Sequence, residues 1–233
     1  MVLKFFLFAF LFLLISCTGF ERDNPDDPDG TTFQPNVVYG EPVSYMREIY
    51  QTVVIGNQVW MARNLNYNAS GSKCYENKDA NCAIYGRLYD WATAMNLSSS
   101  CNSISCSSQI EAKHKGICPS GWHIPNNADW DELYNYVGTK SKYLKATSGW
   151  NGGGNGYDRY GFSALPGGNG GGEGGYGGSY GSFYNVGDYG WWWSSSESDK
   201  NEAYIRYIFN EYEGASYGDW WKVCLLSVRC VKD

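Results

Sequence analysis

Residues 52–61 read TVVIGNQVWM, two short apolar runs on either side of the dipeptide Gly56-Asn57. Runs rich in β-branched and aromatic residues around a two-residue turn with glycine predict a β-hairpin. Two later segments of the same character, residues 203–209 (AYIRYIF) and 223–231 (VCLLSVRCV), predict further strands. Strands are therefore expected at both ends of the folded region.

The chain between these strands contains two predicted helices. The first spans residues 89–97, with Trp91, Ala94 and Met95 on one side. The second begins at Asn126 or Asn127 and ends before Gly138. Its apolar residues follow the i, i+3, i+4, i+7 spacing of one buried helix face: Trp130, Leu133, Tyr134 and Val137. Strands, then helices, then more strands predict an α+β fold.

Glycine dominates residues 151–190, which hold more than half of the 29 glycines. No strand in this stretch precedes a Gly-x-Gly-x-x-Gly sequence that opens a helix, and no Lys-Ser or Lys-Thr pair follows a glycine loop. Both observations argue against a nucleotide site. Long loops are the expected structure. Four apolar side chains would attach these loops to the core: Phe162, Leu165, Phe183 and Tyr184.

A tryptophan triplet follows the glycine-rich stretch, since residues 191–197 read WWWSSSE and are predicted to form a strand. Side chains alternate between the two faces of a strand, so Trp192 should point away from its neighbours. Aromatic rings framed by carboxylates suit sugar recognition, because a ring has an apolar face that can pack against C–H groups. The candidate ligand-binding residues are Trp191, Trp192, Trp193, Trp220, Asp188 and Glu197. The alternative is that half of these tryptophans belong to the core.

The composition narrows the possible partners. The chain has 233 residues and a formal net charge of -6, which argues against nucleic acid because phosphate binding requires a basic surface. Aromatic residues make up 17% of the chain, with Trp 10 and Tyr 20. Two interpretations of this aromatic excess are equally favoured. It could form a ring-rich binding surface on an exported domain, or it could be a compositional trait of the protein family.

Residues 1–16 have the features of a signal peptide. Lys4 provides the positive charge expected at the N-terminal end of a signal peptide. Residues 5–15 form an apolar run that is shorter than the roughly 20 residues needed to span a bilayer. The run ends in residues 14–17 (LISC), which resemble the lipobox of bacterial lipoproteins. We therefore expect acylation of Cys17, with palmitate among the chains, so that the protein binds the membrane through its lipid anchor. The alternative is a chance cysteine after a conventional signal peptide.

Residues 17–47 are predicted to be the lipidated cysteine and a flexible acidic tether. Residues 21–30 (ERDNPDDPDG) contain no apolar residue to bury, and they lack the closing glutamate of an EF-hand loop. The acidic stretch resembles the surface-export signals of some Gram-negative lipoproteins. Thr18 is not the aspartate that retains lipoproteins in some inner membranes. Both points favour a lipid-anchored, surface-exposed location on the outer membrane for a folded domain over residues 48–233.

Of the 8 cysteines, all but Cys17 lie in the folded region. Export to an oxidising compartment favours disulfides. The candidate disulfide pairs are Cys74 with Cys82, Cys101 with Cys106, and Cys118 with Cys230. Cys224 is the one cysteine of the folded region outside these candidate pairs. Zinc is not expected, because no Cys-x-x-Cys occurs and His114 and His123 are not spaced as ligands. No metal or other cofactor is predicted, although calcium stays open.

Six segments, taken in order, are similar to the Fibrobacter succinogenes major paralogous domain family: residues 52–67, 86–91, 118–125, 161–168, 193–197 and 227–231. Members of this family are typically exported and often lipid-anchored. The family distantly resembles the C-type lectin and sulfatase-modifying-factor superfamily, here in residues 122–125 and 228–230. This resemblance implies a single C-type-lectin-like domain with two main helices, short antiparallel strands and long Gly-rich loops that carry the site.

Three kinds of function are compatible with these features. The first is a non-enzymatic cell-surface domain that binds an extracellular polysaccharide or protein. Lectin-type calcium is not supported, because residues 48–233 contain no Glu-Pro-Asn, Gln-Pro-Asp or Trp-Asn-Asp motif. The second is a structural or assembly role in the cell envelope. The third is a formylglycine-generating type of enzyme, which needs a close pair of reactive thiols where only Cys224 is available.

A hydrolase with paired carboxylates also stays open, because the separation of two carboxylates is a property of the tertiary structure. No nucleophile elbow occurs in the sequence. We therefore predict the first function, binding of an extracellular polymer such as a carbohydrate without enzymatic activity.

Overall fold

The computed structural model of the chain describes residues 37–138, 140–172, 181–212 and 214–233. The chain divides into two compact units, and the second, Gln34–Asp233, contains all described elements. The predicted signal peptide, Cys17 and the acidic stretch 21–30 lie outside the described residues. Within the described ranges, no helix combines the length and apolar character that crossing a membrane requires.

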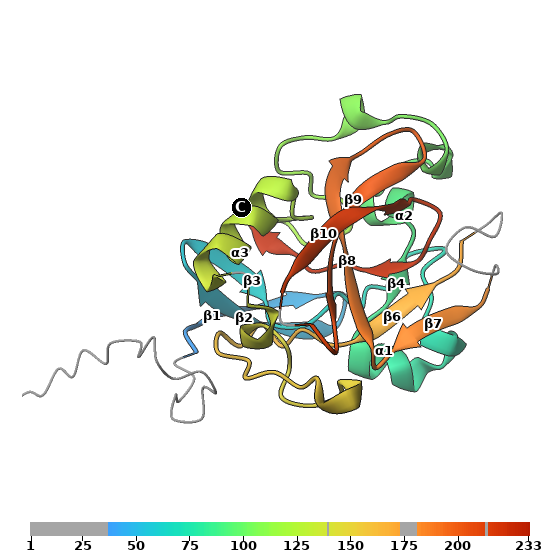
Figure 1. The fold of residues 1–233 in the computed structure, drawn as a ribbon. Helices are drawn as coiled ribbons and strands as arrows, with labels where there is room; N and C mark the ends of the chain where they lie inside the picture. The colour runs from blue at the N-terminus through green and yellow to red at the C-terminus, as the bar shows by residue number, and fades with distance from the viewer. Residues whose placement is uncertain (1–36, 139, 173–180, 213) are drawn as a thin grey trace, which may run out of the picture. The chain divides into compact units, whose positions relative to one another are not determined.

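The first of two five-stranded sheets has the order β1-β2-β3-β12-β5. Its strands are β1 Tyr39–Tyr45, β2 Glu48–Ile55, β3 Gln58–Met61, β12 Val231–Lys232 and β5 Trp122–His123. Figure 1 labels three of these strands, β1, β2 and β3. The predicted hairpin is confirmed, since β2 and β3 pair antiparallel around Gly56, whose φ of 61° suits glycine. Val231 pairs with both Trp60 and His123, so strands from both ends of the domain lie side by side.

Strand β1 corrects the prediction of a flexible tether as far as residue 47. It pairs antiparallel with β2, from Tyr39 opposite Val53 to Tyr45 opposite Glu48. Val43 and Tyr45 pack against the main hydrophobic core, which gives this segment an apolar anchor that residues 21–30 lack. The ordered domain therefore begins before residue 48.

The second sheet has the order β10-β9-β8-β11-β4. Its strands are β10 Ser216–Trp221, β9 Glu202–Phe209, β8 Tyr189–Glu197, β11 Leu226–Ser227 and β4 Leu88–Tyr89. Neighbouring strands are antiparallel except β11 and β8, which are parallel where Ser227 lies opposite Trp192. The sheet therefore joins strands from the middle and the end of the chain.

Part of the glycine-rich stretch forms sheet instead of the predicted loops. Strands β6 Gly167–Gly170 and β7 Phe183–Val186 pair antiparallel. At Gly168, with φ 65°, an added Cβ would lie 2.3 Å from the carbonyl oxygen of Tyr184, so only glycine allows this close approach. Phe162 is buried, whereas Leu165, Phe183 and Tyr184 are half-buried.

The described α-helices are α1 Asp79–Tyr85, α2 Trp91–Met95 and α3 Asn127–Val137. The predicted second helix is α3, with a capping box between Asn126 and Asp129 at its start and Gly138 at φ 73° at its end. Helix α2 is shorter than the predicted 89–97, because Tyr89 belongs to β4 and Asn96 is left-handed. The sequence analysis did not predict α1. Sheets with a few helices confirm the α+β class.

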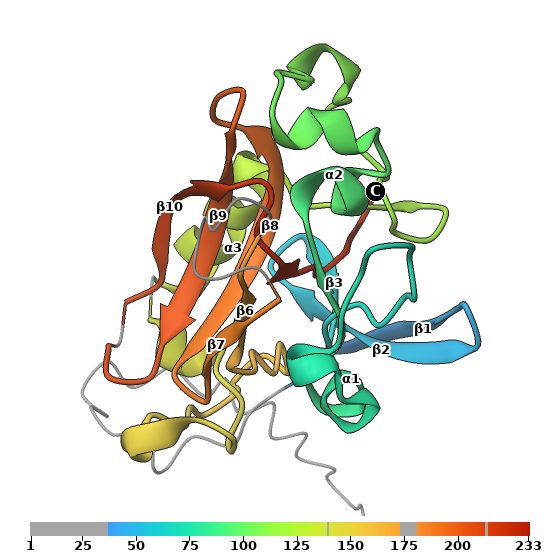
Figure 2. The same ribbon diagram turned by 90° about the vertical axis from the view of Figure 1, so that its right-hand side faces the viewer.

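Strand β8 separates two hydrophobic clusters, because its side chains alternate between two faces. Trp191 and Trp193 lie in one cluster, and Trp192 lies in the other with Trp60 and Trp130. The predicted alternation is confirmed. Figure 2 shows α3 behind β8 and β9, with the β6–β7 hairpin on the viewer's side. The predicted apolar face of α3 is buried in the Trp192 cluster.

A fully buried guanidinium, that of Arg229, lies where the two sheets meet. Its Nε and Nη2 donate to Asn64 Oδ1 at 3.0 and 2.7 Å, and its Nη1 donates to the carbonyl oxygens of Met61 and Phe162. Burial lowers the pKa of Arg229 to about 9, against the opposing effect of the Asp158 charge. The guanidinium therefore stays charged at neutral pH and needs all of these acceptors.

Asn64 extends this network to the second sheet. Its Oδ1 also accepts from Trp192 Nε1 at 2.8 Å, and its Nδ2 donates to the carbonyl oxygen of Tyr85 at 2.9 Å. One amide side chain therefore joins the irregular segment after β3, the centre of β8 and the end of α1.

Replacement of Arg229 tests the importance of this network. Arg229→Met should lower the free energy of unfolding by about 3 kcal/mol or more, because buried acceptors lose their donors and each costs roughly 1–3 kcal/mol. Urea denaturation of the oxidised full chain measures the change. The matched control is Arg63→Met, since Arg63 is partly exposed and pairs with Glu48. We expect a loss below about 1 kcal/mol there, and equal losses in both variants would contradict the central role of Arg229.

Candidate functional site

Two of the predicted ligand-binding tryptophans are core residues. Trp192 is 1% exposed and Trp193 is 0% exposed. Trp193 Nε1 donates to the carbonyl oxygen of Tyr89 at 2.7 Å, and Trp192 Nε1 is bound by Asn64. Both rings are enclosed on all sides by protein, so neither offers a face to a ligand. This corrects the prediction for these two residues.

Trp191 and Trp220 belong to a ladder of rings on one face of β8, β9 and β10. Trp191 stacks on Tyr189 and on Tyr207, with ring centroids 5.2 and 4.9 Å apart, and Trp220 is tilted against it at 5.3 Å. With these three ring neighbours, Trp191 is only 9% exposed. Trp220 is half-buried. The ladder therefore does not present Trp191 as a flat platform for a sugar.

The two predicted carboxylates lie far apart along β8. Asp188 precedes the strand and accepts from Asn151 Nδ2 at 3.1 Å and from Asn210 Nδ2 at 3.2 Å. Glu197 is the last residue of β8. Because the strand rises about 3.3 Å per residue, the structure does not bring Asp188 and Glu197 together in one site.

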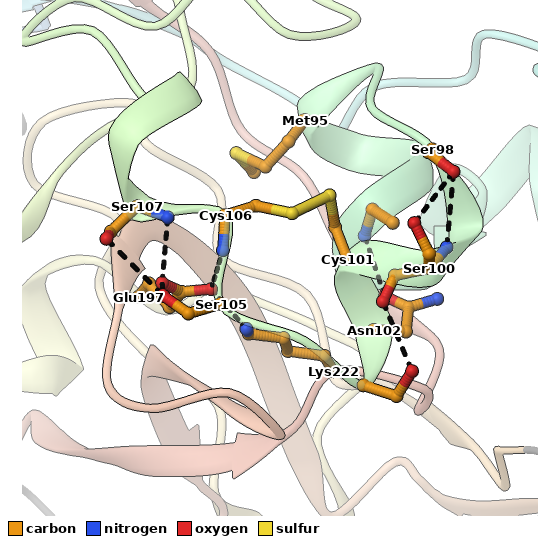
Figure 3. The surroundings of a disulfide bond; sticks show 12 residues. Met95, Ser98, Ser100, Cys101, Asn102, Ser105, Cys106, Ser107, Glu197 and Lys222 are labelled. Carbon is orange, nitrogen blue, oxygen red and sulfur yellow. Dashed lines mark hydrogen bonds and ion pairs between the residues drawn. A yellow bond between two sulfur atoms is a disulfide. The ribbon is translucent and has the colours of Figure 1, made fainter.

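Glu197 holds a loop in place (Figure 3). Its carboxylate accepts from Ser105 Oγ at 2.6 Å and from the backbone N–H groups of Cys106 and Ser107 at 2.8 and 2.9 Å. It also forms an ion pair with Lys222, whose side chain is 0% exposed. Burial raises the pKa of Glu197, but hydrogen bonds from Lys222, Ser105 and Cys106 outweigh this effect and lower it. Glu197 is thus a structural anchor.

The three predicted disulfides are confirmed: Cys74–Cys82, Cys101–Cys106 and Cys118–Cys230. Cys224 is buried and stays a thiol. Burial raises its pKa to about 11, although hydrogen bonds from the Gly172 amide and Trp220 oppose the shift. A thiol that ionises so reluctantly is a poor nucleophile.

A cavity of about 540 Å³ lies beside the Cys101–Cys106 loop. Its volume is in the range of small-molecule sites. The lining is mostly small and polar: Gly71, Lys73, Asp90, Ser98, Ser99, Ser100, Asn102, Ser103, Gly171, Gly172, Val223 and Leu225. Five separate segments of the chain therefore contribute to one concave surface.

Hydrogen bonds fix the polar side of this serine-lined cavity. Asp90 caps α2 by accepting from the N–H and the Oγ1 of Thr93 at 2.9 and 2.7 Å. Asn102 donates to Asp90 Oδ1 at 2.8 Å and accepts from the N–H of Ala92 at 2.9 Å. Figure 3 shows Asn102 and the neighbouring Ser98–Ser100 hydrogen bonds next to the disulfide. The cavity wall is therefore held by a disulfide on one side and by Asp90 on the other.

The cavity combines chemically different groups. Asp90 and Asn102 offer acceptors, the serines offer hydroxyl groups that donate and accept, and exposed Lys73 adds a cation. Val223 and Leu225 add an aliphatic surface. Such a lining can bind a hydroxyl-rich molecule that also has C–H faces.

His123 has structural contacts with two carboxylates. His123 is 2% exposed and lies between Asp129, at 3.2 Å from Nε2, and Asp233, at 2.8 Å from Nδ1. Burial lowers its pKa, but the two carboxylates outweigh burial and raise it. Among the described residues, no group of three or more His, Cys, Asp or Glu side chains could hold a metal ion.

Sequence reasoning missed the cavity. The serine-rich loop between Cys101 and Cys106 is visible in the sequence, but its position opposite Val223 and Leu225 is not. Asp90 could have been found as a helix cap, because it precedes a short apolar run. Its place in a cavity depends on contacts between distant segments.

The fold and the site together define the class of protein. It is a sheet-rich α+β domain with three disulfides and a polar cavity lined by loops. The chain belongs to the Fibrobacter succinogenes major domain family, whose family model matches residues 53–232. A comparison with curated proteins found no significant match, and a comparison with solved structures found none either.

Glu197→Gln tests whether Glu197 anchors the serine-rich loop at the Cys101–Cys106 disulfide, which we call the serine loop. The variant leaves the buried Lys222 ammonium without its counter-charge, so the free energy of unfolding should fall by about 3 kcal/mol. The loosened loop should also let dithiothreitol reduce Cys101–Cys106 faster. Glu111→Gln, at an exposed carboxylate, is the control and should change stability by less than about 0.5 kcal/mol. Wild-type stability and reduction rate in Glu197→Gln would exclude the anchoring role.

Proposed function

We propose that this protein is a non-enzymatic, exported binding protein that recognises a polysaccharide through the serine-lined cavity. The observation that carries the proposal is the cavity itself, about 540 Å³ in volume and lined by hydroxyl, amide, carboxylate and ammonium groups. Concave sites with a few convergent polar groups are the usual form of a ligand site.

The chemistry of a sugar matches this lining. Sugar hydroxyls can donate to Asp90 and exchange hydrogen bonds with Asn102 and the serines, while Val223 and Leu225 face sugar C–H groups. The Asp90–Asn102 contact and the Cys101–Cys106 disulfide fix these groups before the ligand arrives. Preorganisation of this kind favours binding, because less conformational entropy is lost.

We further propose that the domain is C-type-lectin-like. The pairing of β12 with β3 near the two ends of the domain supports this, as does a cavity built from loops. Fold analogy does not supply a ligand, so the polysaccharide assignment depends on the cavity.

A structural or assembly role in the cell envelope is the second candidate. The burial of Trp192 and Trp193 favours it, because these rings do not serve a sugar. A formylglycine-generating type of enzyme is less favoured, since Cys224 is one buried thiol with a raised pKa.

Binding to a panel of plant and microbial polysaccharides tests the cavity. Ser99 lines the cavity and is exposed, so Ser99→Trp should fill it and weaken binding at least about tenfold, or about 1.4 kcal/mol. Asp90→Asn keeps the cap and the contacts with Thr93 and Asn102, and should weaken binding by removing the charge. The full chain in mild detergent should be titrated with and without a chelator, which reveals any metal requirement.

Ser108→Trp is the matched control, because Ser108 is also exposed but does not line the cavity. Its binding should equal that of the wild type. Undiminished binding by Ser99→Trp would exclude the cavity as the site. Failure of every polysaccharide to bind a folded, oxidised sample would favour the structural or assembly role.

We also propose that Cys17 is acylated and that the lipid anchors the protein in the outer membrane with the domain at the cell surface. Lys4, the apolar run 5–15 and the LISC sequence before residue 18 support this. Cys17→Ala should abolish labelling with a clickable palmitate analogue and release the protein from membranes. Cys224→Ala is the control that should keep the label. Labelling of Cys17→Ala at the wild-type level would refute lipidation, and protection of the wild type from external protease in intact cells would refute surface exposure.

A further inference from the structure

Strand β10 is an edge strand that has one charged side chain, Asp219, but lacks the proline, the lysine and the register shift that protect other edges. Of the outer strands of the two five-stranded sheets, β4 and β5 are two residues long, and β1 has Pro42 at a register shift. β10 pairs with β9 in unbroken register over six residues and contains neither proline nor lysine. Figure 2 shows it at the outside of its sheet. Such edges recruit another strand, because their N–H and C=O groups lack partners.

The hydrogen-bond pattern between β9 and β10 shows which backbone groups of β10 point away from β9. The N–H of Lys222 donates to the carbonyl oxygen of Asn201 at 2.9 Å, in the same register as the rest of the pair. Hydrogen-bonded and non-hydrogen-bonded pairs alternate in an antiparallel ladder. Tyr217 and Asp219 therefore direct their N–H and C=O groups away from β9. Within the described ranges, no hydrogen bond reaches these four groups.

The open part of the edge is short and bounded at both ends. Before it, Gly214 pairs with Lys140 in an isolated bridge. After it, the carbonyl oxygen of Trp221 accepts from the N–H of Cys224 at 2.9 Å. The edge can therefore accept only a few residues of another chain, which suits a peptide segment better than a whole additional sheet.

Side chains beside this edge define the chemistry of a partner. Tyr217 and Asp219 share one face of β10, and Tyr217 is 74% exposed. Asp219 lies near Asp199 and Glu202, and burial together with the charges of these two aspartates raises the pKa of Glu202. Lys200 is the exposed cation in this region. Three carboxylates against one exposed ammonium favour a cationic partner.

We propose that β10 binds an extended, cationic peptide segment of another protein by antiparallel strand addition, with a lysine or arginine beside Asp219 and an aliphatic side chain over Tyr217. The backbone groups of Tyr217 and Asp219 supply the hydrogen bonds, and the carboxylates supply the preference for positive charge. A second copy of the chain is a poorer occupant, because it would bring two Asp219 carboxylates onto one short ladder between molecules of net charge -6. This surface does not use the serine-lined cavity. Peptide binding at β10 and polysaccharide binding in the cavity can therefore be tested independently.

Two fluorescent eight-residue peptides test the proposal. Both alternate valine and threonine, and they differ only in a central lysine or glutamate. Titration of the full chain in mild detergent, followed by fluorescence anisotropy, should show saturable binding of the lysine peptide, at least about tenfold tighter than the glutamate peptide. Hydrogen exchange of the Tyr217 and Asp219 amides should slow in the complex. N-methylation of the peptide on its β10-facing edge should abolish binding, whereas N-methylation on the opposite edge should not.

Two variants at one position separate backbone from charge. Asp219→Thr keeps the N–H and should weaken the preference for lysine, to which Asp199 and Glu202 still contribute, without removing binding. Asp219→Pro removes an N–H that β9 does not use, so the strand should persist while peptide binding is lost. The absence of saturable binding to folded wild type would overturn the proposal, as would an equal affinity for both peptides. A wild-type dimer that Asp219→Pro dissociates would also overturn it in favour of a second copy.

Discussion

The structure depends on the need to satisfy one buried charge. Arg229 has no contact with solvent, and its guanidinium is surrounded by the Asn64 side chain and by carbonyl oxygens of Met61 and Phe162. A buried cation without acceptors would destabilise the fold strongly. These acceptors come from the end of β3 and from the loop before β6, so they can meet only when both segments are correctly placed. Cys118–Cys230, at the next residue, adds a covalent link to the same place.

A rigid interior allows the loops to carry the cavity. The Glu197–Lys222 pair and the Cys101–Cys106 disulfide hold one side of the serine loop, and the Asp90–Asn102 contact holds the other. Loops fixed by a scaffold often form binding sites, because their side chains are accessible while their backbone is not free to rearrange. The same anchoring explains why Glu197, an attractive ligand-binding candidate in sequence, is a structural residue.

The buried tryptophans show that a high aromatic content is not by itself evidence of a ligand-binding surface. Indole N–H groups of Trp91, Trp192 and Trp193 donate to Ser194, Asn64 and Tyr89, respectively. Each ring thus fills core volume and also joins two segments through a hydrogen bond. Polar contacts of this kind allow tryptophan to be fully buried. For these three residues, a high aromatic content reflects the construction of the core.

Short-range features were determined by the sequence alone. The β2–β3 hairpin, the capping of α3 by Asn126 and Gly138, the alternation of Trp191 and Trp192, and the disulfide partners close in sequence all follow from residues a few positions apart. The apolar character of residues 223–231 also predicted a strand there, which the structure divides into β11 and β12, but it did not predict the role of Arg229. Tertiary structure alone decided that both faces of β8 are covered, that Asp188 and Glu197 are separated, and that Ser99 and Leu225 share a cavity. The physical reason is that burial and cavity formation depend on contacts between distant segments, whereas turns, caps and strand alternation depend on local backbone geometry.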